Sequence, residues 1–139
     1  LYWYKMTGLN SLYLEENGFT GTIPSEIGLM TGLIPSEIGL MTGLNSLYLE
    51  ENGFTGTIPS EIGLLTDLIE LVLDGNDFTG TIPSEIGSLT GLEQLSIGNN
   101  GLTGTFPCEI GLMTELISLN LWNSSITGTI PSEIGLMTG

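Results

Sequence analysis

A 24-residue sequence unit recurs along the chain and constrains its fold more than any other feature. Self-similarity at a period of about 20–50 residues marks proteins in which short units stack side by side. One unit of this length cannot bury its own apolar face, so the period predicts a solenoid whose core is shared between neighbouring coils. The five full copies begin at Leu9, Leu44, Leu68, Leu92 and Leu116.

Apolar residues keep fixed places within the unit. With positions numbered 1 to 24 from the leading leucine, positions 1, 4, 6, 11, 15, 19 and 22 are apolar in all five copies. Each such side chain contributes about 1.5–3 kcal/mol when buried, which offsets the entropy cost of ordering the chain only once coils stack. The pattern therefore predicts one continuous core. In the copy over 68–91 these residues are Leu68, Leu71, Leu73, Phe78, Ile82, Ile86 and Leu89.

Polar residues and glycines recur as well. A buried amide needs hydrogen-bond partners, so we expect the asparagines at position 9 to bond the backbone of neighbouring coils. Ser124 breaks this ladder in the last copy. Glycine at positions 13 and 20 indicates tight packing or positive φ, and a serine at position 17 is placed to cap a short helical turn. The ladder consists of Asn17, Asn52, Asn76 and Asn100.

The consensus of the units reads L-x-x-L-x-L-x-x-N-x-F/L-T-G-x-I-P-x-x-I-G. From Leu9 onward the chain resembles plant-type leucine-rich repeat proteins, which include receptor-kinase ectodomains, secreted inhibitors and algal proteins. The resemblance implies an α/β fold, a right-handed leucine-rich-repeat solenoid with a concave parallel β-sheet. It also implies a second short β-strand per repeat, at F-T-G-T-I, and 3₁₀ turns on the convex side, at S-E-I-G. The family suggests an extracellular or cell-surface setting.

We expect the whole chain, 1–139, to form a single domain. A truncated repeat over 33–43 lacks the strand and the asparagine of a full unit. We expect the strands near 11–14 and 46–49 to remain neighbours while this extra segment bulges from the convex side; the alternative is that the first repeat undocks. Since neither end has a polar cap, we expect a fragment of a parent protein with further repeats. The full repeats span 9–32, 44–67, 68–91, 92–115 and 116–139, and a partial repeat spans 1–8.

Composition narrows the classes of function. Sixteen acidic residues against one lysine give a net charge of −15, so nucleic acids and anionic membranes, which require a basic surface, are not expected as partners. The same charge permits a basic partner. Because the chain has no histidine, Ser-His-Asp and Cys-His catalysis is impossible, and we expect neither an enzyme nor a cofactor. No apolar run approaches the length of a membrane span.

Outward-facing residues of the predicted concave sheet are candidates for binding. Side chains alternate along a strand, so positions 4 and 6 face the core while positions 3, 5 and 7 face solvent. Exposed aromatic residues on a rigid surface suit protein or peptide recognition. The β-propensity of tyrosine and valine explains them equally well, but it does not explain an exposed tryptophan. The candidate protein-binding residues are Tyr13, Tyr48, Glu50, Val72, Asp74, Asn120 and Trp122.

Threonines at positions 12 and 14 form a second array. In extended T-G-T segments both hydroxyls face outward, so stacked coils predict two columns, spaced about 4.8 Å between coils and roughly 6.6 Å along the strand. Such a grid resembles the ice-binding face of solenoid antifreeze proteins, which makes ice binding the alternative function. Position 12 belongs to the family consensus, so only position 14 is informative. The candidate residues are Thr55, Thr57, Thr79, Thr81, Thr103, Thr105, Thr127 and Thr129.

Overall fold

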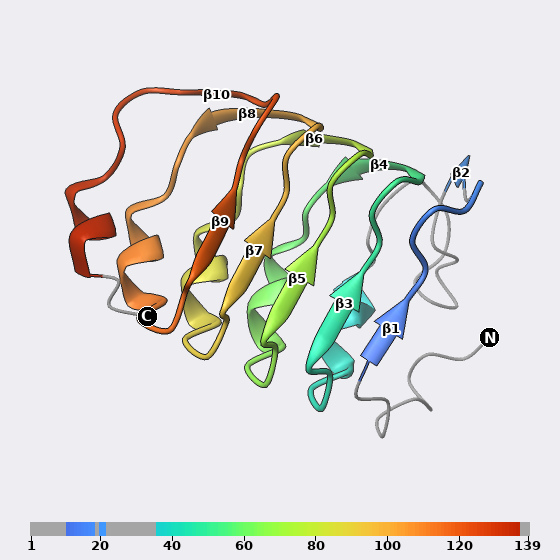
Figure 1. Cartoon of the computed structure of the whole chain (residues 1–139), viewed down its shortest axis with the longest axis horizontal. Coiled ribbons are helices and arrows are strands. Elements are labelled where there is room, and N and C mark those ends of the chain that lie inside the picture. Colours follow the sequence, from blue (N-terminus) through green and yellow to red (C-terminus); the bar gives the residue numbers. More distant parts are fainter. Residues whose placement is uncertain (1–10, 19, 22–35, 137–139) are drawn as a thin grey trace.

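The computed structural model describes residues 11–18, 20–21 and 36–136, which wind into stacked coils (Figure 1). The strands form two five-stranded parallel sheets. The front sheet has the order β1 (Ser11–Tyr13), β3 (Ser46–Tyr48), β5 (Glu70–Val72), β7 (Gln94–Ser96) and β9 (Ser118–Asn120). The back sheet has the order β10 (Ser125–Thr127), β8 (Gly101–Thr105), β6 (Asp77–Gly80), β4 (Gly53–Thr57) and β2 (Thr20–Gly21).

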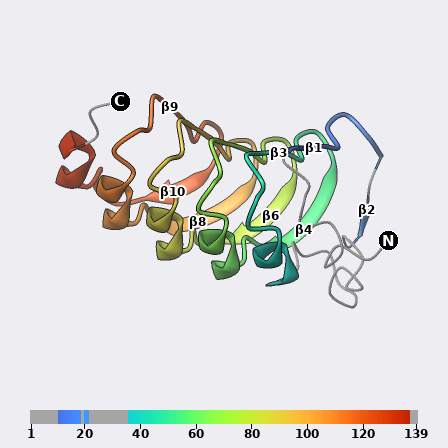
Figure 2. The same ribbon diagram turned by 90° about the horizontal axis from the view of Figure 1, so that it is seen from below.

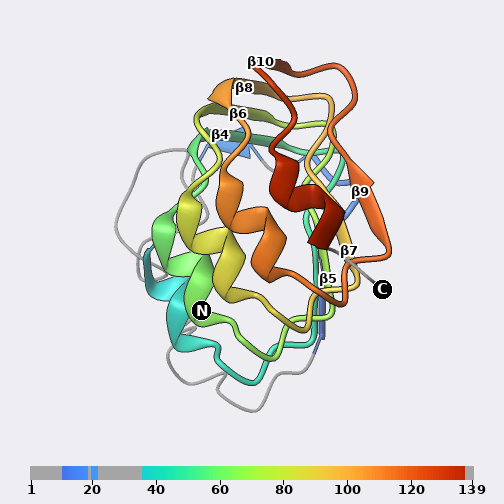
Figure 3. The ribbon, with the colours of Figure 1, turned by 90° about the vertical axis from the view of Figure 1, so that its left-hand side faces the viewer.

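Short 3₁₀ helices close the coils and lie side by side in a row (Figure 2). Viewed along the array, the front sheet, the back sheet and these turns surround the core (Figure 3). The predicted solenoid, with two strands and one 3₁₀ turn per coil, is confirmed. The turns are η3 (Ser36–Leu40), η4 (Ser60–Leu64), η5 (Ser84–Ser88), η6 (Cys108–Leu112) and η7 (Ser132–Leu136).

The apolar columns meet in one core, as the sequence predicts. Leu71 is the register partner of Leu47 on one side and of Leu95 on the other, and all three side chains are completely buried. The same cluster contains the phenylalanines of the back sheet and the isoleucines of the turns η3 to η6. Phe54 and Phe78 stack within it, with ring centroids 6.3 Å apart. Neighbouring coils therefore share their apolar side chains, which makes the outward-facing residues rows on a continuous surface.

The first repeat stays docked on the array, as predicted, and the truncated repeat supplies a turn. The strands of the first repeat remain in the array, because β1 pairs with β3 and β2 pairs with β4. The described part of the truncated repeat does not bulge. Instead, η3 packs against η4 as an ordinary turn, and Ile38 and Met41 are buried in the core. The first coil thus takes its strands from the first repeat and its turn from the truncated one. The residues between Gly21 and Ser36, where any extra segment falls, lie outside the described residues.

The asparagine ladder is present, and the amides of Asn52, Asn76 and Asn100 link four coils. The Asn76 amide donates to the carbonyl of Leu49 in the preceding coil at 2.9 Å and to the carbonyl of Leu73 in its own coil at 3.0 Å. Its Oδ1 accepts a hydrogen bond from the backbone amide of Phe54 at 3.0 Å. Asn100 repeats the arrangement one coil later. The ladder therefore satisfies backbone groups that the turn after each front strand leaves unpaired.

Glycine at position 20 permits the close stacking of the turns. A Cβ added to Gly87 would lie 2.5 Å from the carbonyl oxygen of Glu109 in the next coil.

The serine predicted to cap each turn does not do so. The residue before η4 is Pro59 and makes no side-chain cap, while the Ser60 hydroxyl donates to the adjacent Glu61 carboxylate at 3.2 Å. The Pro59 carbonyl instead accepts the first hydrogen bond of the turn, from the Ile62 amide at 3.1 Å.

Candidate recognition surface on the front sheet

Two stacked tyrosines stand at one end of the outward side of the front sheet, which we call the front face. Tyr13 and Tyr48 are register partners on β1 and β3, and their rings lie 4.8 Å apart and 20° from parallel. Tyr13 is 56% exposed. Burial, then a hydrogen bond to the Glu70 carboxylate, raises the pKa of Tyr48 to about 12. The phenol therefore stays neutral at physiological pH and donates to that carboxylate.

A row of carboxylates follows the strands on the same face. Glu15, Glu50 and Asp74 occupy position 7 of consecutive coils, and all three are half-buried. One carboxylate oxygen of Glu50, Oε2, is buried and has no hydrogen-bond partner among the described residues. Burial raises the pKa of Glu50, and the charges of Glu15 and Asp74 raise it further. The centre of the row is therefore a place where a positive charge from a partner would be favourable.

Replacing Glu50 with glutamine is expected to stabilise the protein in a pH-dependent way. Because the folded-state pKa of Glu50 is raised, the folded state holds the proton more tightly, and stability falls as pH rises through that pKa. Glu50→Gln should raise Tm at pH 7 by about 2 °C and lose this gain near pH 3.5, where the carboxyl is protonated in both states. The control is Glu93→Gln, which removes one exposed charge outside the row. Thermal melts showing the same change for both variants at both pH values would contradict the expectation.

Val72 is not part of the exposed surface, so its predicted exposure is wrong. Its side chain is only 7% exposed although it points outward. It lies between its register partners Tyr48 and Ser96. Cross-strand neighbours on one face contact each other, and the larger side chain of Tyr48 lies directly beside Val72. Val72 therefore contributes little exposed area to the front face.

A polar network occupies the other half of the front face. The Asn120 amide donates to the Ser96 hydroxyl at 2.9 Å and to the Asp74 carboxylate, two strands away, at 3.2 Å. Trp122 is 58% exposed, and its indole lies over Gly98, where an added Cβ would be 2.6 Å from the ring. The glycine therefore lets the tryptophan lie against the sheet. Asp74, Asn120 and Trp122 are thus gathered in one half of the face, and the two tyrosines and Glu50 in the other.

Sequence reasoning missed three contributors to this face. The Glu70 carboxylate accepts hydrogen bonds from the Tyr48 phenol and, at 2.9 Å, from the Ser46 hydroxyl. The Ser96 hydroxyl accepts a hydrogen bond from the Asn120 amide, and Gly98 makes room for Trp122. The available signal was the departure of these positions from the other copies. A glycine occurs at position 7 only in the coil that precedes the tryptophan.

The eight candidate threonines of the back sheet are exposed, but their geometry differs from the predicted grid. The strands pair with a shift, so that Thr57 lies opposite Thr79 instead of Thr81. Equivalent threonines are therefore offset obliquely, and the columns do not run straight across the sheet. Position-12 hydroxyls also donate to the preceding coil: Thr79 to the Gly56 carbonyl at 3.2 Å and Thr103 to the Gly80 carbonyl at 3.3 Å.

The position-14 threonines have a packing role. The Thr81 methyl lies 2.7 Å from the place of an added Cβ on Gly104, a glycine with φ of +81°. Each T-G-T segment therefore joins neighbouring coils through a hydroxyl on one side and a methyl on the other. This role in the fold explains the repetition of threonine without any ligand.

Among the described residues, no group of three or more histidines, cysteines or acids is arranged to hold a metal ion. No helix within those ranges has the length and apolar character needed to cross a membrane.

The sequence pattern that defines the Leucine Rich Repeat matches five segments of the chain, residues 8–30, 43–65, 67–89, 91–113 and 115–137. The chain belongs to the leucine-rich repeat family. Its structural neighbours, described below, include plant receptor ectodomains, so it is a leucine-rich repeat protein of plant type. A search of curated protein sequences found no match.

Three solved structures resemble this leucine-rich repeat protein. The ectodomain of the receptor kinase GASSHO1/SCHENGEN3 from Arabidopsis thaliana, in complex with CASPARIAN STRIP INTEGRITY FACTOR 2, is 38% identical with a TM-score of 0.85, over 98% of this chain and 18% of that one. The plant peptide hormone receptor RGFR1 in complex with RGF2 is 35% identical with a TM-score of 0.84, over 96% and 24%. A plant ice-binding protein is 29% identical with a TM-score of 0.78, over 92% and 38%. The chain thus spans less than two-fifths of each of these proteins.

Proposed function

We propose that this leucine-rich repeat protein is a non-catalytic recognition module that binds a protein or peptide through the front face. The observation that carries the proposal is the arrangement of the aromatic rings on one sheet: the exposed Tyr13 stacks on the half-buried Tyr48, and the exposed Trp122 lies over Gly98. Aromatic residues supply large contact areas at small entropic cost. Two neighbours of high structural similarity carry peptide or protein ligands in their complexes, which supports the same type of role here.

The charge of the face favours a basic partner. Glu15 and Glu50 follow the strands that carry the two tyrosines, and Asp74 follows the next strand toward Trp122. The buried Oε2 of Glu50 has no donor among the described residues. A guanidinium or ammonium group placed there would pair with the carboxylates and could stack on a tyrosine ring.

Likeness to receptor-kinase ectodomains supports an extracellular or cell-surface setting. The proposal includes no catalysis: the exposed thiol of Cys108 has its pKa raised by Glu109, which keeps it protonated and unreactive.

The test is selection of peptides from a random 12-residue phage library, followed by calorimetric titration of the selected peptides. The double variant Tyr48→Ala, Trp122→Ala should bind at least about ten-fold more weakly, which corresponds to about 1.4 kcal/mol. The matched control is Leu64→Ala, Leu112→Ala, which truncates two exposed side chains on the 3₁₀ turns η4 and η6. Equal weakening by both double variants, or none by either, would exclude the front face as the binding surface.

A second candidate function is ice binding through the back sheet. The similarity to a plant ice-binding protein and the eight exposed threonines favour it. If ice binding is the function, Thr79→Tyr with Thr103→Tyr should abolish thermal hysteresis, because the bulky rings would hold the flat array away from the crystal. The front-face variant Tyr48→Ala, Trp122→Ala should leave hysteresis unchanged. Absence of hysteresis in the unmodified protein, or full activity in the threonine variant, would eliminate this candidate.

A further inference from the structure

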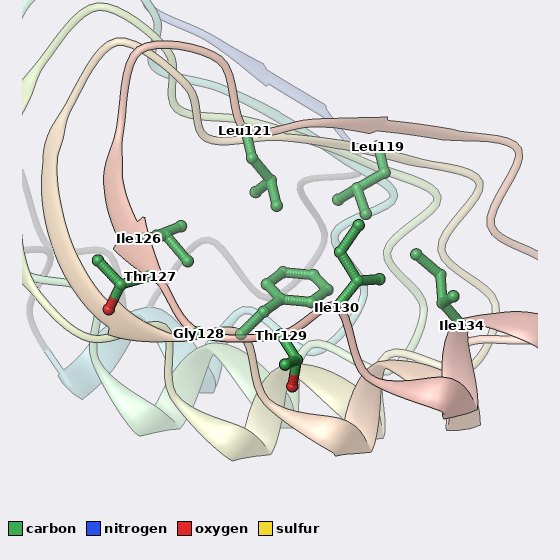
Figure 4. Close-up of a pocket in the computed structure, with 9 residues that line it drawn as sticks. Leu119, Leu121, Ile126, Thr127, Gly128, Thr129, Ile130 and Ile134 are labelled. Atoms are coloured by element: carbon green, nitrogen blue, oxygen red, sulfur yellow. The ribbon is translucent and has the colours of Figure 1, made fainter.

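An apolar cavity of about 280 Å³ opens between β9 and β10 (Figure 4). Leu119 and Leu121 line it from the front sheet, and Ile126 and Ile130 line it from the back. These residues occupy core positions of the repeat, and Ile82, which corresponds to Ile130, is buried in the interior of the array. The cavity therefore belongs to the core that neighbouring coils share, and it is not a separate binding site.

A different set of apolar side chains is exposed along the row of 3₁₀ turns. The last residue of each turn, at position 21 of the repeat, is a leucine in four of the five described turns and Ser88 in the other. Leu64 and Leu112 have a coil on either side, so their exposure is a property of the position. We call these side chains the leucine stripe. Its members, each more than half exposed, are Leu40, Leu64, Leu112 and Leu136.

The fold does not require leucine at this position. Ser88 occupies it in the middle of the array, and η5 nevertheless has the same length as the other turns and packs against both η4 and η6. The leucine side chain lies over the surface of the preceding coil instead of entering the core: the Leu64 Cδ1 is 2.8 Å from the place of an added Cβ on Gly39. A row of large apolar side chains that the core does not use is characteristic of a contact surface for another molecule.

A column of carboxylates runs beside the leucine stripe. Position 18, the second residue of each turn, is glutamate in every copy. The Glu61 Cβ lies 3.3 Å from the same added Cβ on Gly39 that Leu64 approaches, so the two side chains flank one point on the preceding turn. The Ser84 hydroxyl donates to the Glu85 carboxylate at 3.2 Å, and the same bond recurs in η4 and η7. The described column consists of Glu61, Glu85, Glu109 and Glu133.

No positive charge neutralises this column among the described residues. The chain has a single lysine, Lys5, which lies outside them, and it has no arginine or histidine. Carboxylates on coils that stack roughly 5 Å apart repel each other. A partner that brings basic groups to the row would relieve this repulsion, whereas two copies of the chain meeting here would add to it. The charge therefore favours a basic partner over self-association.

The spacing of the row matches that of an α-helix. Coils stack roughly 5 Å apart, and an α-helix rises about 5.4 Å per turn. A helix lying along the row therefore places one side chain per turn, at i, i+4 and i+7, next to each successive 3₁₀ turn. An extended strand repeats its side chains on one face about every 6.6 Å and falls out of step after two coils. The row from η3 to η7 covers about 20 Å, which corresponds to about 14 helical residues.

We propose that the row of 3₁₀ turns is a docking surface for a basic amphipathic helix of a partner protein. Apolar side chains of the helix pack on the leucine stripe, and lysine or arginine side chains along one flank pair with the glutamate column. Ser88 interrupts the stripe, so the helix carries a small or polar residue at its centre. The turns and the front sheet lie on different sides of the core (Figure 3), so this surface is independent of the front face.

The probe is a capped synthetic peptide of about 15 residues, built on alanine, with four leucines at helical spacing, a central serine and lysines along one flank. The unmodified protein should bind it with a Kd of about 100 µM or lower in calorimetric titration, with NMR shift changes at the amides of η4 to η6. Leu64→Ser with Leu112→Ser introduces the residue that Ser88 already provides at this position, so it should preserve Tm and weaken binding at least ten-fold. The matched control, Tyr48→Ala with Trp122→Ala, should bind the peptide unchanged.

A second pair of substitutions tests the charge. Glu85→Gln with Glu109→Gln should weaken binding and reduce its dependence on salt, and the peptide with glutamates in place of lysines should not bind. Absence of binding at about 1 mM peptide, or equal binding by the leucine variant, would overturn the proposal. Self-association in sedimentation experiments, or attachment to phosphatidylcholine vesicles, would also overturn it if lost in Leu64→Ser with Leu112→Ser, because a second copy or a lipid surface would then be the occupant.

Discussion

Replacing Gly87 with alanine is expected to destabilise the protein by roughly 3 kcal/mol, lowering Tm by about 10 °C. The new Cβ would lie 2.5 Å from the carbonyl oxygen and 2.7 Å from the Cβ of Glu109. Neither contact can relax by a side-chain rotation, because both atoms belong to or adjoin the backbone of η6. The two turns would have to separate, which would open the core between Ile86 and Ile110, both of which are almost completely buried.

The matched control is Gly91→Ala, since a Cβ on Gly91 would meet nothing within 4 Å. Both substitutions add one methyl group and both reduce the entropy of the unfolded chain to the same extent. A difference in Tm between the two variants therefore measures the contact with the next coil alone. Similar Tm values in thermal melts followed by circular dichroism would show that the turns do not stack as closely as the structure has them.

The fold was predictable from the sequence because it depends on periodic information. The columns that contain Leu71 and Phe78 recur in every copy, and a column that never admits a polar residue has to be buried. The asparagine ladder followed from the same periodicity, since an amide in a buried column needs backbone partners. Repetition thus encodes the interface between coils as well as the coil itself.

The path of the chain around the duplication was not predictable in the same way. The segments 23–33 and 34–44 are identical, so no residue distinguishes which copy forms the turn of the first coil. The structure uses the second copy, whose η3 is separated from β3 by only five residues, 41–45. Short connections between successive elements are generally favoured. The division into repeats identified the truncated unit as the extra segment, whereas in the structure this unit supplies the turn η3 of the first coil.

The candidate surface was predicted only in part, because exposure on a sheet depends on neighbouring side chains as well as on the repeat. Alternation along a strand predicts the direction of a side chain but not the size of the side chains beside it. Val72 therefore points outward and is nevertheless buried. The contact between Trp122 and Gly98 depends on two positions in adjacent coils considered together. The threonine grid failed because strand register in the back sheet is shifted by two residues relative to the repeat. Pairwise properties of this kind are absent from a single column of the sequence.

Replacing Asn76 with alanine is expected to cost about 2–3 kcal/mol, with most of the loss arising at one backbone group. The carbonyls of Leu49 and Leu73 would each retain a second donor, from Asn52 at 3.2 Å and Asn100 at 3.0 Å. The amide of Phe54 has no such substitute, since its acceptor is the Oδ1 of Asn76. The Asn76→Ala variant should therefore lose hydrogen-exchange protection at the Phe54 amide before it loses protection elsewhere in the sheet.

Two comparisons separate the ladder from the general effect of truncating an asparagine. Asn17 occupies the same position in the first coil but is exposed, and among the described residues its amide bonds the carbonyls of Leu14 and Glu15 in its own coil. Asn17→Ala should therefore cost less than about 1 kcal/mol. In the next coil, the Phe78 amide donates to the Oδ1 of Asn100 in the same way. Asn100→Ala should therefore remove protection at Phe78 instead of at Phe54. Equal costs for Asn76→Ala and Asn17→Ala, or loss of protection spread evenly over both phenylalanine amides in each variant, would show that the ladder does not hold individual coils together.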